Sequence, residues 1–309
     1  MMNIASEPGD ARRDPSLSAI LGERRHLINV GYRLLGSLSD AEDMVQETYA
    51  RWYAMSEQQR AAIESPGGWL TTVASRICFD LLGSARARRE SYVGEWLPEP
   101  LPDRTPWTTG QSSGDPADRI TLDESITMAF LVVLEAMTPA ERVALVLHDV
   151  FGYAFAEVAD IVGRTPAACR QLASSARRRL RTAREPATPQ TQRADIVRDF
   201  KQAWAANDLD ALIGILDPGV RAIGDGGGLV DAASRPIESS QEVARYLIDL
   251  ISRAPEMTIL ERTVNGEPGL VLQRADVTEG VLAFDIAGDR ITRIWAMRNP
   301  AKLRHWMAP

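Results

Sequence analysis

The sequence is poor in the residues from which disulfide frameworks and metal centres are built. Its 309 residues include only two cysteines, Cys78 and Cys169, and three histidines, His26, His148 and His305. No pair of these has the short spacing of a metal-binding motif. We therefore expect no disulfide, no metal and no cofactor, and a chain that works in the reducing conditions of the cytoplasm.

Long apolar segments are also missing. No run of about 18 consecutive apolar residues exists, which excludes a membrane-spanning helix. Residues 1–16 are polar and lack the apolar centre of a secretory signal. With 45% hydrophobic and 25% charged residues, the composition is that of a globular protein of two or three domains.

Positive charge is scarce overall but locally concentrated. The chain has 35 basic and 42 acidic residues, a net charge of −7. Residues 1–185 contribute 21 basic and 25 acidic side chains and residues 186–309 contribute 14 and 17, so neither part is basic. However, residues 164–184 hold seven arginines and no acidic residue, and residues 76–89 hold four arginines against Asp80. Any contact with nucleic acid must come from such local patches.

Helix-start signals dominate the first 185 residues. Apolar residues recur at helical spacing over residues 17–35, and Gly36 ends that run. Further helices are predicted at four start signals: the capping boxes Ser39–Glu42 and Thr138–Glu141, and the pairs Ser65-Pro66 and Thr165-Pro166. Residues 91–118 hold five prolines and three glycines, a density that predicts a linker.

The pattern changes after residue 194. Two helices are predicted over 195–206 and 208–217, and a third over 240–252 with Ser239 as its N-cap. Residues 220–225 and 229–233 flank three glycines and predict a hairpin. Alternating runs over 256–264, 269–277, 280–287 and 290–298 predict an antiparallel meander. This order is typical of an α+β domain.

The arginine-rich stretch follows a short amphipathic segment, 155-FAEVADIVG-163. Small and apolar residues on both sides of Arg164 allow two helices to pack across a tight turn, which is helix-turn-helix geometry. The alternative is a solvated helix face, the usual role of an arginine run. In a helix-turn-helix, the second helix enters the major groove. The residues expected to face DNA are Arg164, Thr165, Arg170, Gln171, Ser174, Ser175, Arg177, Arg178 and Arg181.

Three segments carry a family resemblance. Residues 138–184 resemble the fourth region of extracytoplasmic-function (ECF) RNA polymerase sigma factors, which reads the −35 promoter element. The segment 40-DAEDMVQETYARWY-53 resembles the core-polymerase-binding helix of region 2, and 66-PGGWLTTVASRICFDLLGSARARR-89 resembles the helix that melts and reads the −10 element. The resemblance implies polymerase contacts from Asp40, Asp43, Gln46, Glu47 and Arg51. It implies −10 contacts from Trp69, which could stack on a flipped base, and from Arg76, Arg86, Arg88 and Arg89.

The C-terminal third resembles a SnoaL-like (NTF2-like) cone. The motifs 96-WLPEP-100, 225-DGGG-228 and 299-NPAKL-303 resemble those of the ECF41 group, sigma factors with a fused SnoaL-like domain. In that group a lysine commonly follows the third glycine and the last motif commonly reads NPDKL; Leu229 and Ala301 stand in those places here. The resemblance implies a regulatory contact with the sigma domains through Trp96, Leu97, Pro98, Glu99, Pro100, Asp225, Gly226, Gly227, Gly228, Asn299, Pro300, Lys302 and Leu303.

Catalysis in the cone would require a general base, for which Asp225, Asp231 and Asp285 are the candidates. A carboxylate beside three glycines is more often a turn former. No nucleophile–base pair is visible, so we expect no enzyme activity.

The predicted fold is multidomain: two all-α sigma domains, the second with the helix-turn-helix, and an α+β cone. The expected domains are sigma region 2 over 17–90, the linker over 91–118, sigma region 4 over 119–185 and the SnoaL-like domain over 194–309. The predicted function is an alternative sigma factor that binds core RNA polymerase and promoter DNA and is regulated in cis by its C-terminal domain. A ligand-responsive helix-turn-helix repressor, or a SnoaL-like enzyme fused to a DNA-binding module, is the alternative. Whether the cone binds a ligand stays open.

Overall fold

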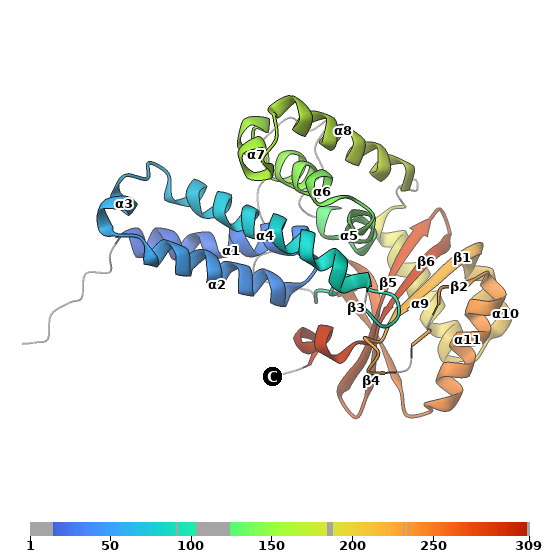
Figure 1. The fold of residues 1–309 in the computed structure, drawn as a ribbon. Helices are drawn as coiled ribbons and strands as arrows, with labels where there is room; N and C mark the ends of the chain where they lie inside the picture. The colour runs from blue at the N-terminus through green and yellow to red at the C-terminus, as the bar shows by residue number, and fades with distance from the viewer. Residues whose placement is uncertain are drawn as a thin grey trace, which may run out of the picture.

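The computed structural model describes residues 15–90, 92–102, 124–183, 188–230, 232–233 and 235–307, without the side chains of residues 15–21, 85–90, 124 and 183. Two helical units are followed by a unit built on a six-stranded sheet. Figure 1 shows the sheet unit beside both helical units. The predicted fold class is confirmed. Within the described residues, none of the helices is apolar over a length that could cross a membrane.

The first helical unit contains α1 (Pro15–Leu35), α2 (Leu38–Ala54), the short α3 (Glu57–Ala61) and α4 (Pro66–Glu90). Gly36 ends α1 with a φ of 70°, a conformation that favours glycine. The capping box predicted at Ser39 is wrong: Ser37 is the N-cap of α2, and its hydroxyl accepts from the Asp40 amide at 3.2 Å. Ser37 follows the Gly36 turn directly, so α2 begins at Leu38, two residues earlier than the sequence pattern indicated.

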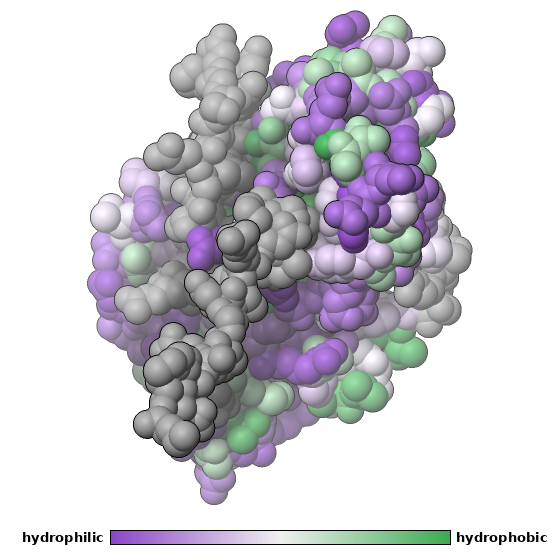
Figure 2. Space-filling view, turned by 90° about the vertical axis from the view of Figure 1, so that its left-hand side faces the viewer, coloured by the Kyte–Doolittle hydropathy of each residue, from purple (hydrophilic) through white to green (hydrophobic). Residues whose placement is uncertain are grey.

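The second helical unit contains η1 (Glu124–Ile126), α5 (Met128–Glu135), α6 (Pro139–Leu145), the π-helical turn η2 (Val146–Val150), α7 (Phe155–Val162) and α8 (Pro166–Ala183). The capping box at Thr138 is confirmed, because its hydroxyl accepts from the Glu141 amide while the Glu141 carboxylate accepts from the Thr138 amide. Gly163, with a φ of 69°, makes the turn between α7 and α8. Figure 2, viewed from the α3 end, shows a mostly hydrophilic surface over the upper part, where these two helices lie.

The third unit begins with α9 (Gln190–Ala205) and α10 (Leu209–Ile215) and contains α11 (Ser240–Arg253) between its strands. The strands are β1 (Leu216–Asp225), β2 (Ile237–Glu238), β3 (Thr258–Val264), β4 (Glu267–Arg274), β5 (Val277–Ala287) and β6 (Arg290–Met297). They form one sheet in the order β2-β1-β6-β5-β4-β3, in which β1 and β6 run parallel and all other neighbours antiparallel. The chain ends with η3 (Pro300–Lys302) and η4 (Arg304–Trp306).

The hairpin predicted around the three glycines is wrong. Residues 229–230 and 232–233 do not form a strand, and β1 pairs instead with β2. Gly227 and Gly228 have φ values of 63° and 69°, and the Gly227 amide donates to Asp225 Oδ1 at 3.0 Å. The chain therefore folds into a tight turn held by Asp225 and leaves the sheet.

Both faces of the sheet are covered. Because side chains alternate along a strand, Leu270, Leu272 and Leu282 face α9 and α11, whereas Val271 and Trp295 face the other way. The second face packs against Leu97 of the linker, Met128 of α5 and Leu303 near the C-terminus. The linker and the second helical unit thus form part of the cover of the sheet.

Candidate nucleic-acid interface and interdomain contacts

Helix α8 presents a buried face and an exposed face. Cys169, Ala173 and Ala176 recur at helical spacing and are fully buried against the rest of the unit. The exposed side chains include most of those expected to face DNA: Arg164, Thr165, Arg170, Gln171, Ser174, Arg178 and Arg181. This arrangement of a short helix, a glycine turn and an exposed arginine-rich helix is helix-turn-helix geometry.

Two residues expected on the exposed face have a structural role instead. Arg177 donates two hydrogen bonds to the carboxylate of buried Asp149, at 2.8 and 2.9 Å. Ser175 donates to Glu141 Oε1 at 2.8 Å. Both side chains therefore hold α8 against α6 and η2, because the buried carboxylates need partners there. Their predicted outward orientation is wrong.

The start of α8 is ordered by its own residues. The Thr165 hydroxyl accepts from the Ala168 amide at 3.2 Å, which confirms the predicted N-cap. The Arg170 guanidinium lies 5.2 Å from the centre of the Phe155 ring, a cation–π distance. Phe155 of α7 thus holds the exposed Arg170 near the start of α8 before any partner binds.

On α4, the residues expected at the −10 element are differently placed. Trp69 is half-buried and packs edge-on against Trp52, with 5.3 Å between the ring centres. Arg76 is exposed, and its Nη2 donates to the Asp160 carbonyl of α7 at 3.0 Å. Arg86, Arg88 and Arg89 lie on the last turns of α4, and their side chains lie outside the described residues.

Helix α2 has the two faces that its sequence predicted. Ala41, Val45, Thr48 and Trp52 are buried. On the opposite side Asp43, Gln46, Glu47 and Arg51 are exposed and Asp40 is half-buried. Arg51 and Glu47 form an i,i+4 ion pair of 2.8 Å, which is surface-exposed and contributes little to stability. The polar face is therefore open to a partner.

The two helical units share one apolar core and several polar contacts. Arg142 of α6 is buried and donates to the Leu34 carbonyl of α1 at 2.9 Å and to Leu134 and Glu135 of its own unit. Burial lowers the pKa of Arg142 to about 9. His26 of α1 lies 3.2 Å from the Tyr153 hydroxyl of the second unit. The units are packed against each other and not spread apart.

The three short motifs meet in the third unit at the carboxylate of Asp225, which is 0% exposed. Lys302 Nζ lies 2.7 Å from Asp225 Oδ2 and donates to the Leu97 carbonyl at 2.6 Å. The Leu97 amide and the Tyr92 hydroxyl also donate to this carboxylate, at 3.0 and 2.6 Å. Asn299 donates to the Tyr92 hydroxyl at 2.8 Å. We call Tyr92, Leu97, Asp225, Asn299 and Lys302 the Asp225 cluster.

The other motif residues complete this contact. Trp96 covers the Lys302 ammonium at 4.1 Å, and Pro98 packs beside Gly36. The Pro100 carbonyl accepts from the Trp306 indole at 2.8 Å. Gly226 and Gly227 leave no room for a Cβ beside Val230 and Asn299, and Gly228 lies against Val93. Pro300 begins η3, and Leu303 is buried in the core beneath the linker.

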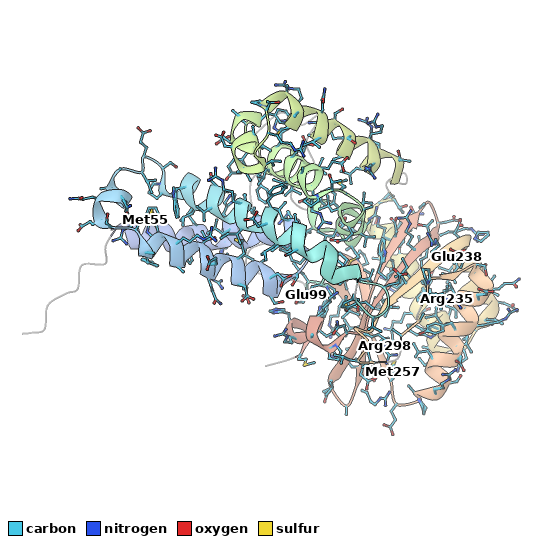
Figure 3. The ribbon with its side chains drawn as sticks, in the orientation of Figure 1. Met55, Glu99, Arg235, Glu238, Met257 and Arg298 are labelled. Atoms are coloured by element: carbon cyan, nitrogen blue, oxygen red, sulfur yellow. The ribbon has the colours of Figure 1, made fainter. Side chains whose placement is uncertain are left out.

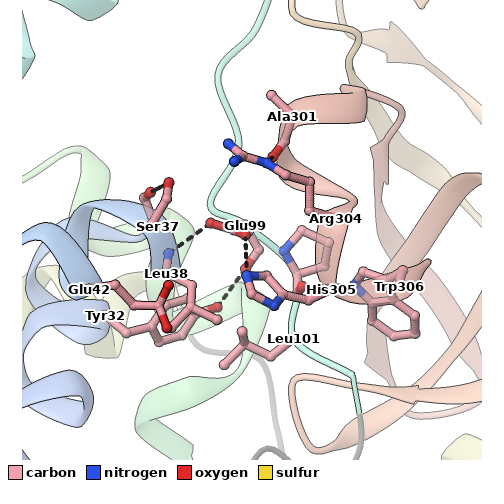
Figure 4. Close-up of polar contacts among 12 residues, drawn as sticks. Tyr32, Ser37, Leu38, Glu42, Glu99, Leu101, Ala301, Arg304, His305 and Trp306 are labelled. Carbon is pink, nitrogen blue, oxygen red and sulfur yellow. Dashed lines mark hydrogen bonds and ion pairs between the residues drawn. The ribbon is translucent and has the colours of Figure 1, made fainter. Parts of the chain in front are cut away.

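Glu99 fastens the linker to the first helical unit, as Figure 4 shows. Its carboxylate accepts from the Leu38 amide at 2.7 Å and lies 3.7 Å from His305 Nε2. Its amide donates to the Gly36 carbonyl at 2.8 Å, and its carbonyl accepts from the Tyr32 hydroxyl at 2.6 Å. Burial raises the pKa of Glu99, although the Leu38 amide and His305 act in the opposite direction.

Comparison with known proteins places this geometry in a family. Residues 20–88 match Sigma-70 region 2 and residues 127–180 match Sigma-70 region 4. The chain is 37% identical over 297 residues to the ECF RNA polymerase sigma factor SigJ of Mycobacterium tuberculosis, with 90% of each chain covered. The chain belongs to the ECF RNA polymerase sigma factors. Its activity is therefore that of a transcription initiation factor, which binds core RNA polymerase and promoter DNA and is not an enzyme.

Two further similarities extend over most of the sigma factor, including its sheet unit. ECF RNA polymerase sigma factor SigG of M. tuberculosis is 30% identical over 334 residues, covering 95% of this chain and 84% of that one. The crystal structure of M. tuberculosis SigJ is similar with a TM-score of 0.70 at 33% identity, covering 94% of this chain and 98% of that chain. The C-terminal unit is an α+β domain, as the sequence pattern predicted.

Three carboxylates of this sigma factor were considered as general bases, and the structure describes the surroundings of two of them. Asp225 is buried and holds the Asp225 cluster together. Asp285 lies on β5 in register with Arg293 of β6. Asp231 lies outside the described residues. Among the residues that the structure describes, no group of three His, Cys, Asp or Glu could hold a metal ion.

Sequence reasoning missed Asn265, which joins all three units of the sigma factor. Asn265 lies in the turn between β3 and β4 with a φ of 53° and is 2% exposed. Its Nδ2 donates to the Tyr32 hydroxyl and to the Ile126 carbonyl, each at 2.8 Å. Its backbone amide donates to the Leu101 carbonyl at 2.9 Å, and its Oδ1 accepts from the Leu101 amide at 3.0 Å. The Asn-Gly pair signals a turn, but nothing local signals these distant partners.

Proposed function

We propose that this sigma factor is of the ECF41 type and that its C-terminal domain holds sigma regions 2 and 4 together in cis. The observation that carries the proposal is the Asp225 cluster, in which residues from all three ECF41-like motifs gather around one buried carboxylate. Glu99 continues the contact from the linker to region 2. The proposed division is region 2 over 17–90, the linker over 91–118, region 4 over 119–185 and the C-terminal domain over 194–309.

In the structure, regions 2 and 4 pack against each other, and we call this the closed arrangement. It is unsuited to promoter recognition. The −10 and −35 elements lie one to two turns of B-DNA apart, roughly 35–70 Å at about 34 Å per turn. Arg76, proposed to face the −10 element, donates to α7 of the helix-turn-helix itself. Regions 2 and 4 must therefore separate before both can reach DNA, and the C-terminal domain opposes this separation by holding the linker between them.

The proposed contacts follow the exposed faces. Helix α2 offers Asp40, Asp43, Gln46, Glu47 and Arg51 to core RNA polymerase. Helix α8 and the turn before it offer Arg164, Arg170, Gln171, Ser174, Arg178 and Arg181 to the −35 element. In the closed arrangement Arg76 is hydrogen-bonded to α7. Arg177 and Ser175 hold α8 against η2 and α6. Such a factor acts where the polymerase is, in the cytoplasm.

In vitro transcription with purified core polymerase tests the proposal. We expect a chain ending at Pro189, which keeps regions 2 and 4 with their shared core, to give more transcript than the full chain. Equal or lower output from the shortened chain would refute inhibition in cis. No transcript from either chain, together with tight unaided binding to duplex promoter DNA, would favour a repressor over an initiation factor.

A further inference from the structure

Two stacked rings hold an exposed arginine near the start of α8. The Arg170 guanidinium lies 5.2 Å from the centre of the Phe155 ring. The His148 imidazole stacks on the same Phe155 ring, with 3.8 Å between the ring centres and 26° between their planes. Phe155 is half-buried whereas Arg170 is exposed, so the rings hold the arginine without enclosing it. We call His148, Phe155 and Arg170 the arginine stack.

The backbone fixes the two rings of the arginine stack. His148 lies in the π-helical turn η2, and the Gly152 amide donates to its carbonyl at 3.1 Å. His148 Nδ1 lies 2.8 Å from the Tyr153 carbonyl, and because a carbonyl can only accept, Nδ1 carries the proton and donates. Phe155 then begins α7. One irregular turn thus places both rings, and π-helical turns of this kind often occur at functional sites.

Arg170 occupies the part of the helix-turn-helix that reaches bases. It lies near the start of α8, and the first residues of such a helix contact base edges in the major groove. Figure 3 shows side chains projecting from α8 on the side away from the other two units. An arginine fork matches the O6 and N7 acceptors of guanine. The place and the chemistry of Arg170 therefore suit a contact with a guanine.

We propose that His148 and Phe155 are positioning residues, which hold the Arg170 guanidinium for one guanine of the −35 element and so set the base preference there. An unrestrained arginine loses rotamer freedom on binding, and it can equally pair with a phosphate, which carries no sequence information. The rings restrict Arg170 before DNA binds and thereby favour the base contact. This inference rests on the proposed contact of α8 with the −35 element.

The expected contribution of the rings is smaller than that of the arginine itself. A bidentate arginine–guanine contact discriminates against a wrong base by about fivefold or more. A cation–π contact at an exposed site changes an equilibrium constant by about two- to fivefold. Loss of the Phe155 ring should therefore weaken the base preference, whereas loss of Arg170 should remove it.

Selection from a randomised promoter library measures this preference. Holoenzyme assembled from the full chain and core polymerase is mixed with duplexes randomised in the −35 and −10 segments, and the retained duplexes are sequenced. At one −35 position, Arg170→Ala should lower the ratio of guanine to the other bases by about fivefold or more. Phe155→Leu should lower the ratio at the same position by about two- to fivefold, and Phe155→Tyr, which keeps the ring, should leave it unchanged.

A matched pair of histidine variants tests the second ring. His148→Leu removes the stacked imidazole and should lower the same ratio by about twofold, because Phe155 loses its support. His26→Leu makes the same change where His26 packs edge-on against Phe151, and it should leave the ratio unchanged. An unchanged ratio in His148→Leu, or equal changes in both variants, would overturn the role of His148.

The ratio separates positioning from stability and from the −35 contact itself. A variant that only destabilises region 4 lowers retention of all duplexes alike and leaves the ratio unchanged. If Arg170→Ala lowers the ratio but Phe155→Leu does not, or if Phe155→Tyr loses as much as Phe155→Leu, the positioning role is wrong and the proposed −35 contact stands. If Arg170→Ala leaves every base preference unchanged, Arg170 reads no base and the inference fails. If the unaltered chain selects no −35 sequence, the proposed −35 contact fails with it.

Discussion

Replacing Lys302 by methionine tests the Asp225 cluster at its ion pair. Methionine keeps much of the side-chain volume but removes the charge and the donors that reach Asp225 and the Leu97 carbonyl. Removing one partner of a buried ion pair costs about 3–5 kcal/mol. Here Asp225 keeps three donors, from Tyr92, Leu97 and Gly227. We therefore expect a loss of about 2–3 kcal/mol in the free energy of unfolding, below the full penalty.

The chain provides a matched control, because Lys201 is its other lysine. Lys201 Nζ lies 2.9 Å from Glu261 Oε1, and the two side chains are 30% and 40% exposed. Solvent weakens such a pair, so Lys201→Met should cost about 1 kcal/mol or less. Urea unfolding followed by tryptophan fluorescence measures both variants. A loss for Lys302→Met no larger than that for Lys201→Met would refute the reasoning.

A double-mutant cycle separates the ion pair from the rest of the cluster. Asp225→Asn keeps the shape of the side chain but removes the charge opposite Lys302. If the two charges interact directly, the double variant should lose clearly less stability than the sum of the single variants, because no unpaired charge is then left buried. Strictly additive losses would show that the two residues act independently.

Four other residues give distinct outcomes. Arg178→Ala should reduce transcription, because it removes an exposed charge that we propose to bind a DNA phosphate. Arg177→Ala should instead lower the free energy of unfolding, because Asp149 loses its partner. The reverse pattern in transcription and urea assays would contradict the assignment of faces. Tyr32→Phe removes a buried hydroxyl shared by Glu99 and Asn265 and should cost about 1–2 kcal/mol in urea unfolding, and a loss within error would count against that network. The raised pKa of Glu99 means that the stability it contributes is complete below the unfolded pKa, near pH 4, and is lost as the pH rises through the raised value. Glu99→Gln should therefore flatten the pH dependence of unfolding from about pH 4 upward; an unchanged profile would contradict this.

Features with a local signal were predictable from the sequence. The N-caps at Ser65, Thr138, Thr165 and Ser239 are confirmed because each hydroxyl accepts a hydrogen bond from an amide three residues on. The four C-terminal strands are confirmed for the same kind of reason, since alternation marks a sheet with two different faces. The helix-turn-helix also has a local cause, the glycine turn at Gly163.

Features that depend on distant partners were not predictable in this way. An arginine at position 177 carries no local sign that a carboxylate from η2 lies behind it. Nor does the Asn-Gly turn at residue 265 indicate that the side-chain amide of Asn265 will reach Tyr32, which is 233 residues away in the chain. The Asp225 contacts were expected only through a family resemblance, because no periodicity places a linker backbone beside a strand end.

The closed arrangement also predicts the order in which partners bind. The polar face of α2, which we propose as the polymerase contact, is exposed in the closed arrangement, so core polymerase could dock there before the sigma regions separate. Arg76, which we propose to face the −10 element, must first release the Asp160 carbonyl before its guanidinium can reach DNA. A partner shifts such an equilibrium only through its preference for the open state, and polymerase can supply that preference first. In a gel-shift assay the full chain alone should therefore bind promoter duplex poorly, and core polymerase should raise its affinity more than tenfold. Tight binding without polymerase would mean that the closed arrangement does not restrict the DNA-facing residues.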